Sequence, residues 1–313
     1  MLAALLAAAL AFTAEDASLA YKTASRLVAE HTPRDAGTRR AHLAADFLMD
    51  AASAAGADVR RDAFSAKTPK GERSFVNLYA EFQVDPAAPW TIVLSHYDTK
   101  PGVKCPGAND GASTSGLLVA LAGRLASCRE GRGNVMLVWT DGEECMEAYL
   151  ENDGFWGSKR AAAMVKERGL KVAGVVCADM LGDKNLAISI PKNSSPALAQ
   201  VALAAAKRAG AADKVSLSPL LVKDDHVAFL NLGFRAMDLI DFEYGSAPGL
   251  NDYWHTEKDT MDKLSVKSLE TAGRLLVEII ASLKGWLADV GWQVALSVRN
   301  MVSFNNNPKS IPL

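Results

Sequence analysis

Imidazole and carboxylate side chains follow the apolar segments of this sequence, at the points where those segments end. The segments 90–95, 134–140, 172–178 and 235–241 are followed by such residues, and a glycine-rich turn at 106–116 (PGANDGASTSG) contributes another. The residues concerned are His96 and Asp98, Asp110, Glu143 and Glu144, Asp179, and His255. Burying so many carboxylates together is costly unless a cation neutralises them. A mixture of imidazole and carboxylate ligands suits zinc, with an open position for water or substrate.

The adjacent acids Glu143 and Glu144 fit a division of labour, in which one carboxylate binds the metal and its neighbour transfers protons. Asp98 lies two residues after His96, so on a strand it could face the same side and orient that imidazole. Each residue taken singly also has a structural explanation: Asp110 could cap a helix, and the Glu pair could be solvated charge at a helix start. Their joint position at the ends of separate segments favours the metal site.

The elements that must position these residues follow from the hydrophobic pattern. The pattern predicts strands at 57–65, 74–82, 90–97, 134–140, 172–180 and 235–241, and helices at 16–31, 37–55, 111–126, 157–168, 195–209 and 265–288. Near-continuous apolar strands that alternate with helices indicate a mostly parallel central sheet with helices on both faces, extended by antiparallel edge strands. In such α/β folds, ligands bind outside the carboxyl ends of the strands.

The composition fits one soluble domain and excludes some partners. The chain has 313 residues, of which 49% are hydrophobic and 22% charged, and no linker divides it. A formal net charge of -2 without a basic stripe argues against nucleic acid. We expect a monomer.

The two ends of the chain are expected to lie outside the catalytic domain, which we place at 15–290. Residues 1–14 (MLAALLAAALAFTA) form a short apolar run that ends in small residues, typical of an export signal and too short to span a bilayer. A secreted or periplasmic protein follows from this interpretation, and an amphipathic helix is the alternative. The tail 291–313 has no role that its sequence indicates. Cys105, Cys128, Cys145 and Cys177 show no C-x-x-C spacing, and a Cys105–Cys145 disulfide would suit an exported protein.

Five motifs resemble those of the zinc aminopeptidases of the bacterial leucyl-aminopeptidase type. They are SHYDTK (95–100), GANDGAS (107–113), TDGEE (140–144), ADMLGD (178–183) and YWHTEKDT (253–260), in the family's order. The resemblance covers roughly residues 75–285 and implies a zinc exopeptidase-like fold that acts on peptide N-termini. For a dinuclear member it implies two zinc ions, with ligands His96, Asp110, Glu144, Asp179 and His255 and with Glu143 as general base.

A closer resemblance is to the glutaminyl-peptide cyclotransferases, which share that fold, use one zinc ion and convert N-terminal glutamine to pyroglutamate. The segments 141–158 (DGEECMEAYLENDGFWGS) and 223–234 (KDDHVAFLNLGF) look like their counterparts. This resemblance implies zinc held by Asp110, Glu144 and His255. It also implies that Glu143 moves protons with Asp179 and Asp224 as acidic partners, and that Trp254 lines the substrate pocket. Tyr149 stands where animal cyclases carry tryptophan, and the loop 242–252 is longer than theirs.

Three functions therefore remain open from the sequence. The first is cyclisation of N-terminal glutamine with release of ammonia. The second is hydrolysis of N-terminal residues by a dinuclear zinc aminopeptidase. The third is a non-catalytic binding domain on the same fold, which would be expected to lose ligands or the base that this sequence retains.

Overall fold

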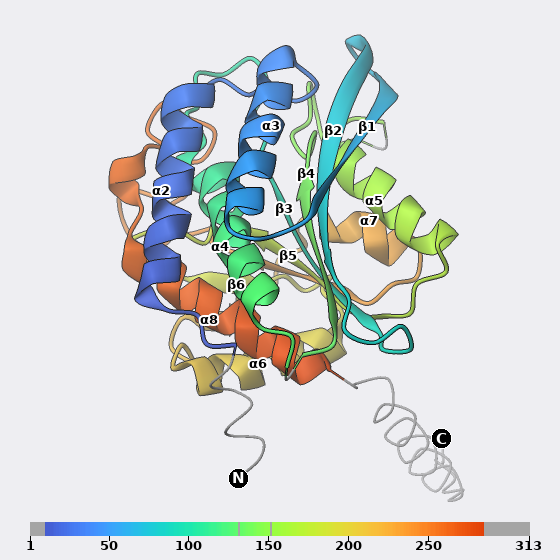
Figure 1. The fold of residues 1–313 in the computed structure, drawn as a ribbon. Helices are drawn as coiled ribbons and strands as arrows, with labels where there is room; N and C mark the ends of the chain where they lie inside the picture. Colours follow the sequence, from blue (N-terminus) through green and yellow to red (C-terminus); the bar gives the residue numbers. More distant parts are fainter. Residues whose placement is uncertain (1–9, 131, 151, 285–313) are drawn as a thin grey trace, which may run out of the picture.

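The computed structural model describes residues 10–284, except residues 131 and 151. In this part of the chain, eight strands form one mixed sheet in the order β1-β2-β4-β3-β5-β8-β6-β7 (Figure 1). The strands are β1 (Val59–Thr68), β2 (Gly71–Phe82), β3 (Trp90–His96), β4 (Asn134–Thr140), β5 (Val172–Asp179), β6 (Ile188–Ile190), β7 (Val215–Leu217) and β8 (Ala236–Ile240).

The centre of the sheet is parallel and its edge is antiparallel. Strands β4, β3, β5 and β8 run parallel to one another, whereas the β1–β2 hairpin on one side and β6 on the other add to them in the antiparallel sense. Every residue of β3 and β4 is buried. This burial explains their unbroken apolar sequences, because a parallel strand is covered on both faces. The predicted fold class is confirmed.

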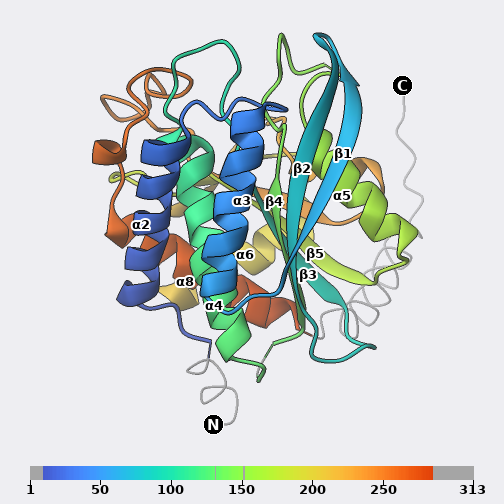
Figure 2. The same ribbon diagram turned by 45° about the horizontal axis from the view of Figure 1, so that its top comes forward.

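Helices cover the two faces of the sheet unequally. They are α2 (Ala14–His31), α3 (Arg39–Ala54), α4 (Thr114–Ser127), α5 (Trp156–Glu167), α6 (Pro196–Ala209), α7 (His226–Asn231) and α8 (Val266–Leu283). Helices α2, α3, α4, α6 and α8 pack on one face in the larger apolar core, and α5 and α7 pack on the other (Figures 1 and 2). The carboxyl ends of β3, β4, β5 and β8 are thereby left at one edge of the sheet, between the two helical layers.

The structure adds short elements that the hydrophobic pattern did not predict. Strands β6 and β7 have three residues each, and α7 has six, so none is long enough to show a period. The helix predicted at 111–126 begins with a kinked segment, Ala108–Ser113, before α4. The helix predicted at 265–288 is seen as α8; residues 285–288 and the tail 291–313 lie outside the described residues.

The segment before α2 packs into the domain. Leu10 and Phe12 are buried, and Phe12 lies so close to Gly273 of α8 that a Cβ there would meet its ring at 2.3 Å. Thr13 caps α2 through a reciprocal pair of hydrogen bonds with Asp16. Residues 1–9, most of the predicted export segment, lie outside the described residues. Among the helices of residues 10–284, none has the length and apolar character needed to cross a bilayer.

All four cysteines are free. The Cys105–Cys145 disulfide that the sequence left open is therefore not formed. The Cys145 thiol instead lies 2.7 Å from Lys100 Nζ, and the Cys105 thiol faces Asp259 Oδ2 at 3.8 Å.

Candidate metal centre and catalytic cavity

The kink before α4 places Asp110 at the edge of the sheet. Asp110 has φ −78° and ψ 98°, and Gly111 has φ 89°, so the backbone leaves the helical path at these two residues. Two features require glycine at position 111. Its φ is left-handed, and a Cβ there would approach the His96 ring at 3.1 Å. The backbone N–H groups of Asn109 and Asp110 donate to the Asp259 carboxylate at 2.7 and 3.2 Å. The loop thus presents the Asp110 carboxylate in a fixed direction.

Asp110, Glu144 and His255, hereafter the outer trio, converge at this edge. His255 Nε2 lies 2.8 Å from Glu144 Oε1 and 3.3 Å from Asp110 Oδ2. His255 reaches this position with φ 55°, a left-handed conformation that is uncommon for a residue with a side chain and is typical of functional sites. Residues that are far apart in the chain therefore meet as the sequence predicted.

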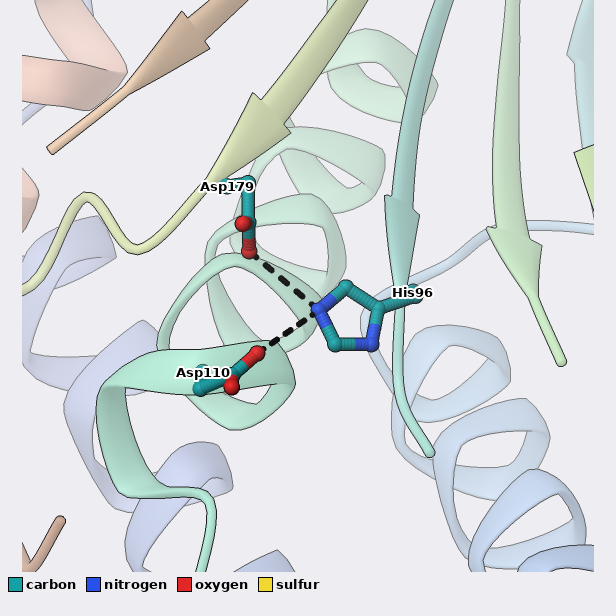
Figure 3. A group of neighbouring side chains, drawn as sticks. All are labelled: His96, Asp110 and Asp179. Atoms are coloured by element: carbon teal, nitrogen blue, oxygen red, sulfur yellow. Dashed lines mark hydrogen bonds and ion pairs between the residues drawn. The ribbon is translucent and has the colours of Figure 1, made fainter. Parts of the chain in front are cut away.

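His96, Asp110 and Asp179, hereafter the inner trio, use the other oxygen of the same Asp110 carboxylate. Figure 3 shows the carboxylates of Asp110, from the kink, and Asp179, from the end of β5, converging on one nitrogen of the His96 ring at the end of β3. His96 Nε2 lies 3.0 Å from Asp110 Oδ1 and 3.2 Å from Asp179 Oδ1. Asp110 is consequently shared by both trios.

The donor sets of both trios fit zinc. In each trio the potential ligand atoms all lie within 4.8 Å of one another. A tetrahedral ion with bonds of about 2.0–2.1 Å has ligand atoms roughly 3.3 Å apart, close to the distances observed here. Two carboxylates and one imidazole in the outer trio would also leave an open position for substrate. The same geometry in the inner trio could hold a second ion.

Asp98 fixes the loop that carries the two glutamates. Its two carboxylate oxygens accept hydrogen bonds from the backbone N–H groups of Glu143 and Glu144, at 3.2 and 3.1 Å. Its Oδ1 also lies 3.5 Å from His96 Nδ1. Asp98 therefore has the position beside His96 that the sequence predicted, and it links that imidazole to the glutamate loop as well.

Glu143 and Glu144 share a hydroxyl partner in Tyr149. The Tyr149 hydroxyl lies 2.8 Å from Glu144 Oε2 and 3.2 Å from Glu143 Oε2. The Tyr149 ring stacks on Phe155, and Lys100 Nζ lies 5.1 Å from the centre of the same ring. Lys100 Nζ is also 3.8 Å from Glu144 Oε2. These contacts hold the two acids side by side.

A cavity of about 330 Å³ opens over the outer trio. Trp254 forms one wall, where its ring stacks on His255 with centroids 3.9 Å apart and meets Phe242 edge-on. The cavity is lined by Asp110, Glu143, Glu144, Tyr149, Asp179, Leu220, Leu221, Val222, Lys223, Asp224, Ile240, Phe242, Trp254 and His255. The cavity therefore combines the candidate metal ligands of the outer trio, the Glu143 carboxylate, which belongs to neither trio, and the aromatic wall formed by Trp254.

A further group of buried acids lies close to Asp179 of the inner trio. Asp224, Asp225 and Asp238 are all buried, and Asp224 Oδ1 accepts from the Cys177 thiol at 3.4 Å. Asp225 accepts from the Thr140 hydroxyl at 2.6 Å, whereas neither oxygen of Asp238 has a hydrogen-bond partner. Cys177, Asp224 and Asp238 lie close enough together to be candidate ligands as well.

Burial and mutual repulsion control the protonation of these acids. Burial and the neighbouring Glu144 raise the pKa of Glu143 well above its usual value. Burial and Asp179 raise the pKa of Asp224 to about 6, and burial raises that of Asp179 to about 6 although His96 opposes this. Asp110 differs: its burial is outweighed by hydrogen bonds from His255 and His96, which hold its pKa below the usual range.

The pKa of His255, the histidine of the outer trio, is raised by its acidic neighbours. Burial disfavours its charged form, but hydrogen bonds with Asp110 and Glu144 outweigh burial and raise the pKa of His255 to about 9. Protons on imidazole thus replace, in part, the positive charge that the acids require. A divalent cation would satisfy the same need.

The structure brings together all the site residues that the sequence indicated: His96, Asp110, Glu143, Glu144, Tyr149, Asp179, Asp224, Trp254 and His255. Two residues that position the Asp110 loop were missed. Asp259 lies within the YWHTEKDT motif, where its acidic type was the only signal. Arg34 is fully buried and donates to the carbonyl oxygens of Tyr97, Pro106 and Gly107, and nothing in its sequence context marks it.

Comparison with known proteins agrees with this geometry. A glutaminyl-peptide cyclotransferase of Dictyostelium discoideum is 23% identical over 279 residues, which cover 72% of this chain and 74% of the relative. The crystal structure of an Acidobacteriales bacterium glutaminyl cyclase is 30% identical, covers 88% of this chain and 96% of its own, and superimposes with a TM-score of 0.79. A Zn-dependent exopeptidase from Parabacteroides distasonis, 22% identical, shares the fold with a TM-score of 0.75 over 87% of this chain and 98% of its own.

The predicted resemblance to the cyclotransferases and zinc exopeptidases is thus confirmed. The family model of peptidase family M28 matches residues 77–280, a range that contains both trios and the cavity wall. Because this match spans more than half of the chain, the chain belongs to peptidase family M28.

Proposed function

We propose that the protein is a zinc-dependent glutaminyl-peptide cyclotransferase that converts N-terminal glutamine to pyroglutamate and releases ammonia. The observation that carries the proposal is the cavity over the outer trio, with Glu143 unligated beside the candidate ligands and Trp254 as its wall. The similarity to a glutaminyl cyclase at 30% identity over most of both chains supports it. The binding-domain alternative is set aside, because family M28 is enzymatic and this chain retains the ligands and the base.

The reaction requires a proton acceptor and a proton donor at the same place. The α-amine attacks the side-chain amide carbon, a C–N bond forms, and the bond to the departing amide nitrogen breaks. Zinc bound by Asp110, Glu144 and His255 would polarise the amide oxygen as a Lewis acid. Glu143 would take a proton from the attacking amine and deliver it to the leaving nitrogen, which departs as ammonia. No water is consumed.

Other residues of the cavity have supporting roles in this proposal. Tyr149 orients the Glu143 carboxylate through its hydroxyl, and Trp254 forms an apolar wall for the glutamine side chain. Asp179 and Asp224 line the same cavity with pKa values raised to about 6, so the pair can hold a proton near Glu143. These acids would keep the substrate amide and its leaving nitrogen oriented.

A dinuclear aminopeptidase is the second candidate, and one observation favours it. The inner trio is complete and shares Asp110 with the outer trio, so a second ion has a full set of ligands. In that case the two ions would activate water for peptide hydrolysis. The number of zinc ions per chain therefore separates the two candidates: one ion supports cyclisation and two support hydrolysis.

The decisive experiment incubates the purified, zinc-loaded protein with Gln-peptides and with leucyl anilides. Cyclisation releases ammonia without free amino acid, whereas hydrolysis of the anilide releases free leucine. Glu143→Gln should abolish the activity while zinc is retained. Glu147→Gln, on the same loop but exposed and paired with Lys70, is the matched control and should behave as wild type. Unchanged activity in Glu143→Gln would remove its assigned role.

We also propose that the protein is exported, as the apolar start of the chain indicates. We expect cleavage at the small residues between Ala11 and Ala14, which would remove the buried Leu10 from the domain. N-terminal sequencing of the protein recovered from the periplasm or medium tests this, and an exported protein that still begins with residues 1–14 would contradict it. A monomeric state remains our expectation, to be measured by sedimentation.

A further inference from the structure

Two consecutive leucines are exposed at the mouth of the cavity. Leu220 and Leu221 are 63% and 75% exposed, more than nearly every other large apolar residue that the structure describes. Both line the cavity that contains Glu143 and His255. A single exposed leucine is ordinary, but an apolar pair at the rim of a catalytic cavity is a candidate binding surface.

The backbone that carries these leucines is fixed. The carbonyl of Leu220 accepts a hydrogen bond from Lys192 N–H at 2.9 Å. The next residue, Val222, exchanges two hydrogen bonds with the side chain of Asn193, at 3.0 and 2.7 Å. The leucines are therefore held in place before any ligand arrives, which lowers the entropy that binding would cost.

The chemistry of the proposed reaction determines what reaches this rim. The α-amine and the side chain of the first residue must both lie beside Glu143, inside a cavity of only about 330 Å³. That volume is at the small end of ligand pockets, so it accommodates little beyond the first residue. The rest of the peptide must leave through the mouth, and its second residue crosses the rim.

We propose that Leu220 and Leu221 form an apolar subsite for the side chain that follows the N-terminal glutamine. Substrates with a bulky aliphatic or aromatic second residue are therefore preferred over those with a polar one of similar size. Lys223, also at the rim, donates to the Tyr149 carbonyl at 2.9 Å and places a positive charge close by, which disfavours lysine or arginine at the second position. This inference rests on the proposed function and names the substrate class of that same site.

The test compares peptides that differ only at the second residue. Gln-Leu and Gln-Asn peptides have second side chains of similar shape and opposite polarity, and Gln-Lys adds the charge. With the zinc-loaded wild type we expect kcat/KM for the leucine peptide to exceed that for the asparagine peptide by about tenfold, mostly through KM. In the double variant Leu220→Ser/Leu221→Ser this ratio should fall towards one.

Leu217→Ser is the matched control, because Leu217 is 56% exposed on nearby β7 and does not line the cavity. It should retain the wild-type ratio. The single variants Leu220→Ser and Leu221→Ser, each at a highly exposed position, show whether one leucine carries the effect. Equal rates on all three peptides, or a preference that survives the double variant, would overturn the subsite. Absence of cyclisation on every Gln-peptide, with release of leucine from its anilide, would instead remove the proposed function and the subsite with it.

Discussion

The outer and inner trios share one carboxylate but have different surroundings. The outer trio faces the cavity, and its histidine stacks on Trp254 of the cavity wall. The inner histidine, His96, is almost completely buried, lies opposite Asp98 and does not line the cavity. Two similar donor sets can thus differ in access. A metal ion bound by the outer trio would face the cavity and could act on substrate. The inner trio can serve equally well as a hydrogen-bonded support for Asp110.

This comparison explains why one fold can host two reactions. Hydrolysis needs a water-activating ion in each trio, whereas cyclisation needs only the ion beside the cavity, because the nucleophile is supplied by the substrate. The residues alone permit both outcomes. Variants that affect the trios unequally are therefore the most informative.

Asp110→Asn should have the largest effect, because it weakens both trios at once. The neutral amide is a poor zinc ligand and no longer offsets the cation, so we expect zinc to be lost and kcat/KM to fall by about 10³-fold or more. Metal analysis of the purified variant, together with the ammonia assay, measures both. Asp213→Asn, at an exposed position, is the control. Full zinc occupancy in Asp110→Asn would show that the trios do not bind the ion as proposed.

His255→Ala and His96→Ala separate the trios directly. If the protein holds one zinc ion in the outer trio, His255→Ala should lose it, while His96→Ala should keep about one per chain with a weaker affinity. Loss of a ligand or its support typically costs about 10–100-fold in metal affinity. Wild-type protein with two ions, of which each variant loses one, would favour the aminopeptidase.

Much of this arrangement could be predicted from the sequence, and the reason is topological. His96 and Asp179 end strands β3 and β5, and parallel strands bring their carboxyl ends to the same edge. The parallel sheet could be predicted from the hydrophobic pattern, because its central strands are unbroken apolar segments. His255 was harder to place, because it follows a loop of some fifteen residues after β8 and takes a left-handed backbone conformation. The pattern included it among the candidate metal ligands, and the motif resemblance implied its place beside Asp110 and Glu144.

The residues that hold the Asp110 loop could not be predicted from pattern. Arg34 and Asp259 act through backbone groups that lie more than sixty residues away from them in the chain. Such contacts impose no period and no spacing on the sequence, since any residue can offer a carbonyl or an N–H. The short strands β6 and β7, three residues each, fall below the length at which alternation is detectable.

Tyr149→Phe should have a moderate effect that is confined to the outer side of the site. It removes the hydroxyl shared by Glu143 and Glu144 and leaves the ring stacked on Phe155. We expect kcat to fall about tenfold with zinc content and KM nearly unchanged, since a hydrogen bond to a charged group is worth about 1.5–3 kcal/mol and part of it is replaced by water.

Tyr149→Trp is the rescue variant for this prediction, because an indole N–H can also donate to a carboxylate. Partial recovery of kcat relative to Tyr149→Phe would identify the donor as the important feature. If Tyr149→Phe instead loses zinc, its hydroxyl acts mainly on the ligand Glu144 and not on Glu143.

Asp225→Asn should affect stability and not metal content, and it tests the group of buried acids formed by Asp224, Asp225 and Asp238. Burial and the charge of Asp224 raise the pKa of Asp225 to about 7, against about 3.9 in an unfolded chain. Because the folded-state pKa is the higher one, the stability that protonated Asp225 provides is complete below about pH 4 and is lost as the pH rises through about 7. Asparagine is neutral at every pH, and its side-chain oxygen can still accept from Thr140.

The free energy of unfolding of Asp225→Asn should therefore increase relative to wild type between about pH 4 and 8, by roughly 2–4 kcal/mol. Urea denaturation of both proteins at matched zinc concentration measures the difference, and because Asp225 belongs to neither trio the contribution of the metal cancels. Parallel curves over this range would mean that Asp225 carries its charge in the fold without cost. Four carboxylate oxygens, on Asp224, Asp225 and Asp238, have no hydrogen-bond partner, which indicates that this group needs positive charge. Parallel curves would mean that this need is smaller than the contacts indicate.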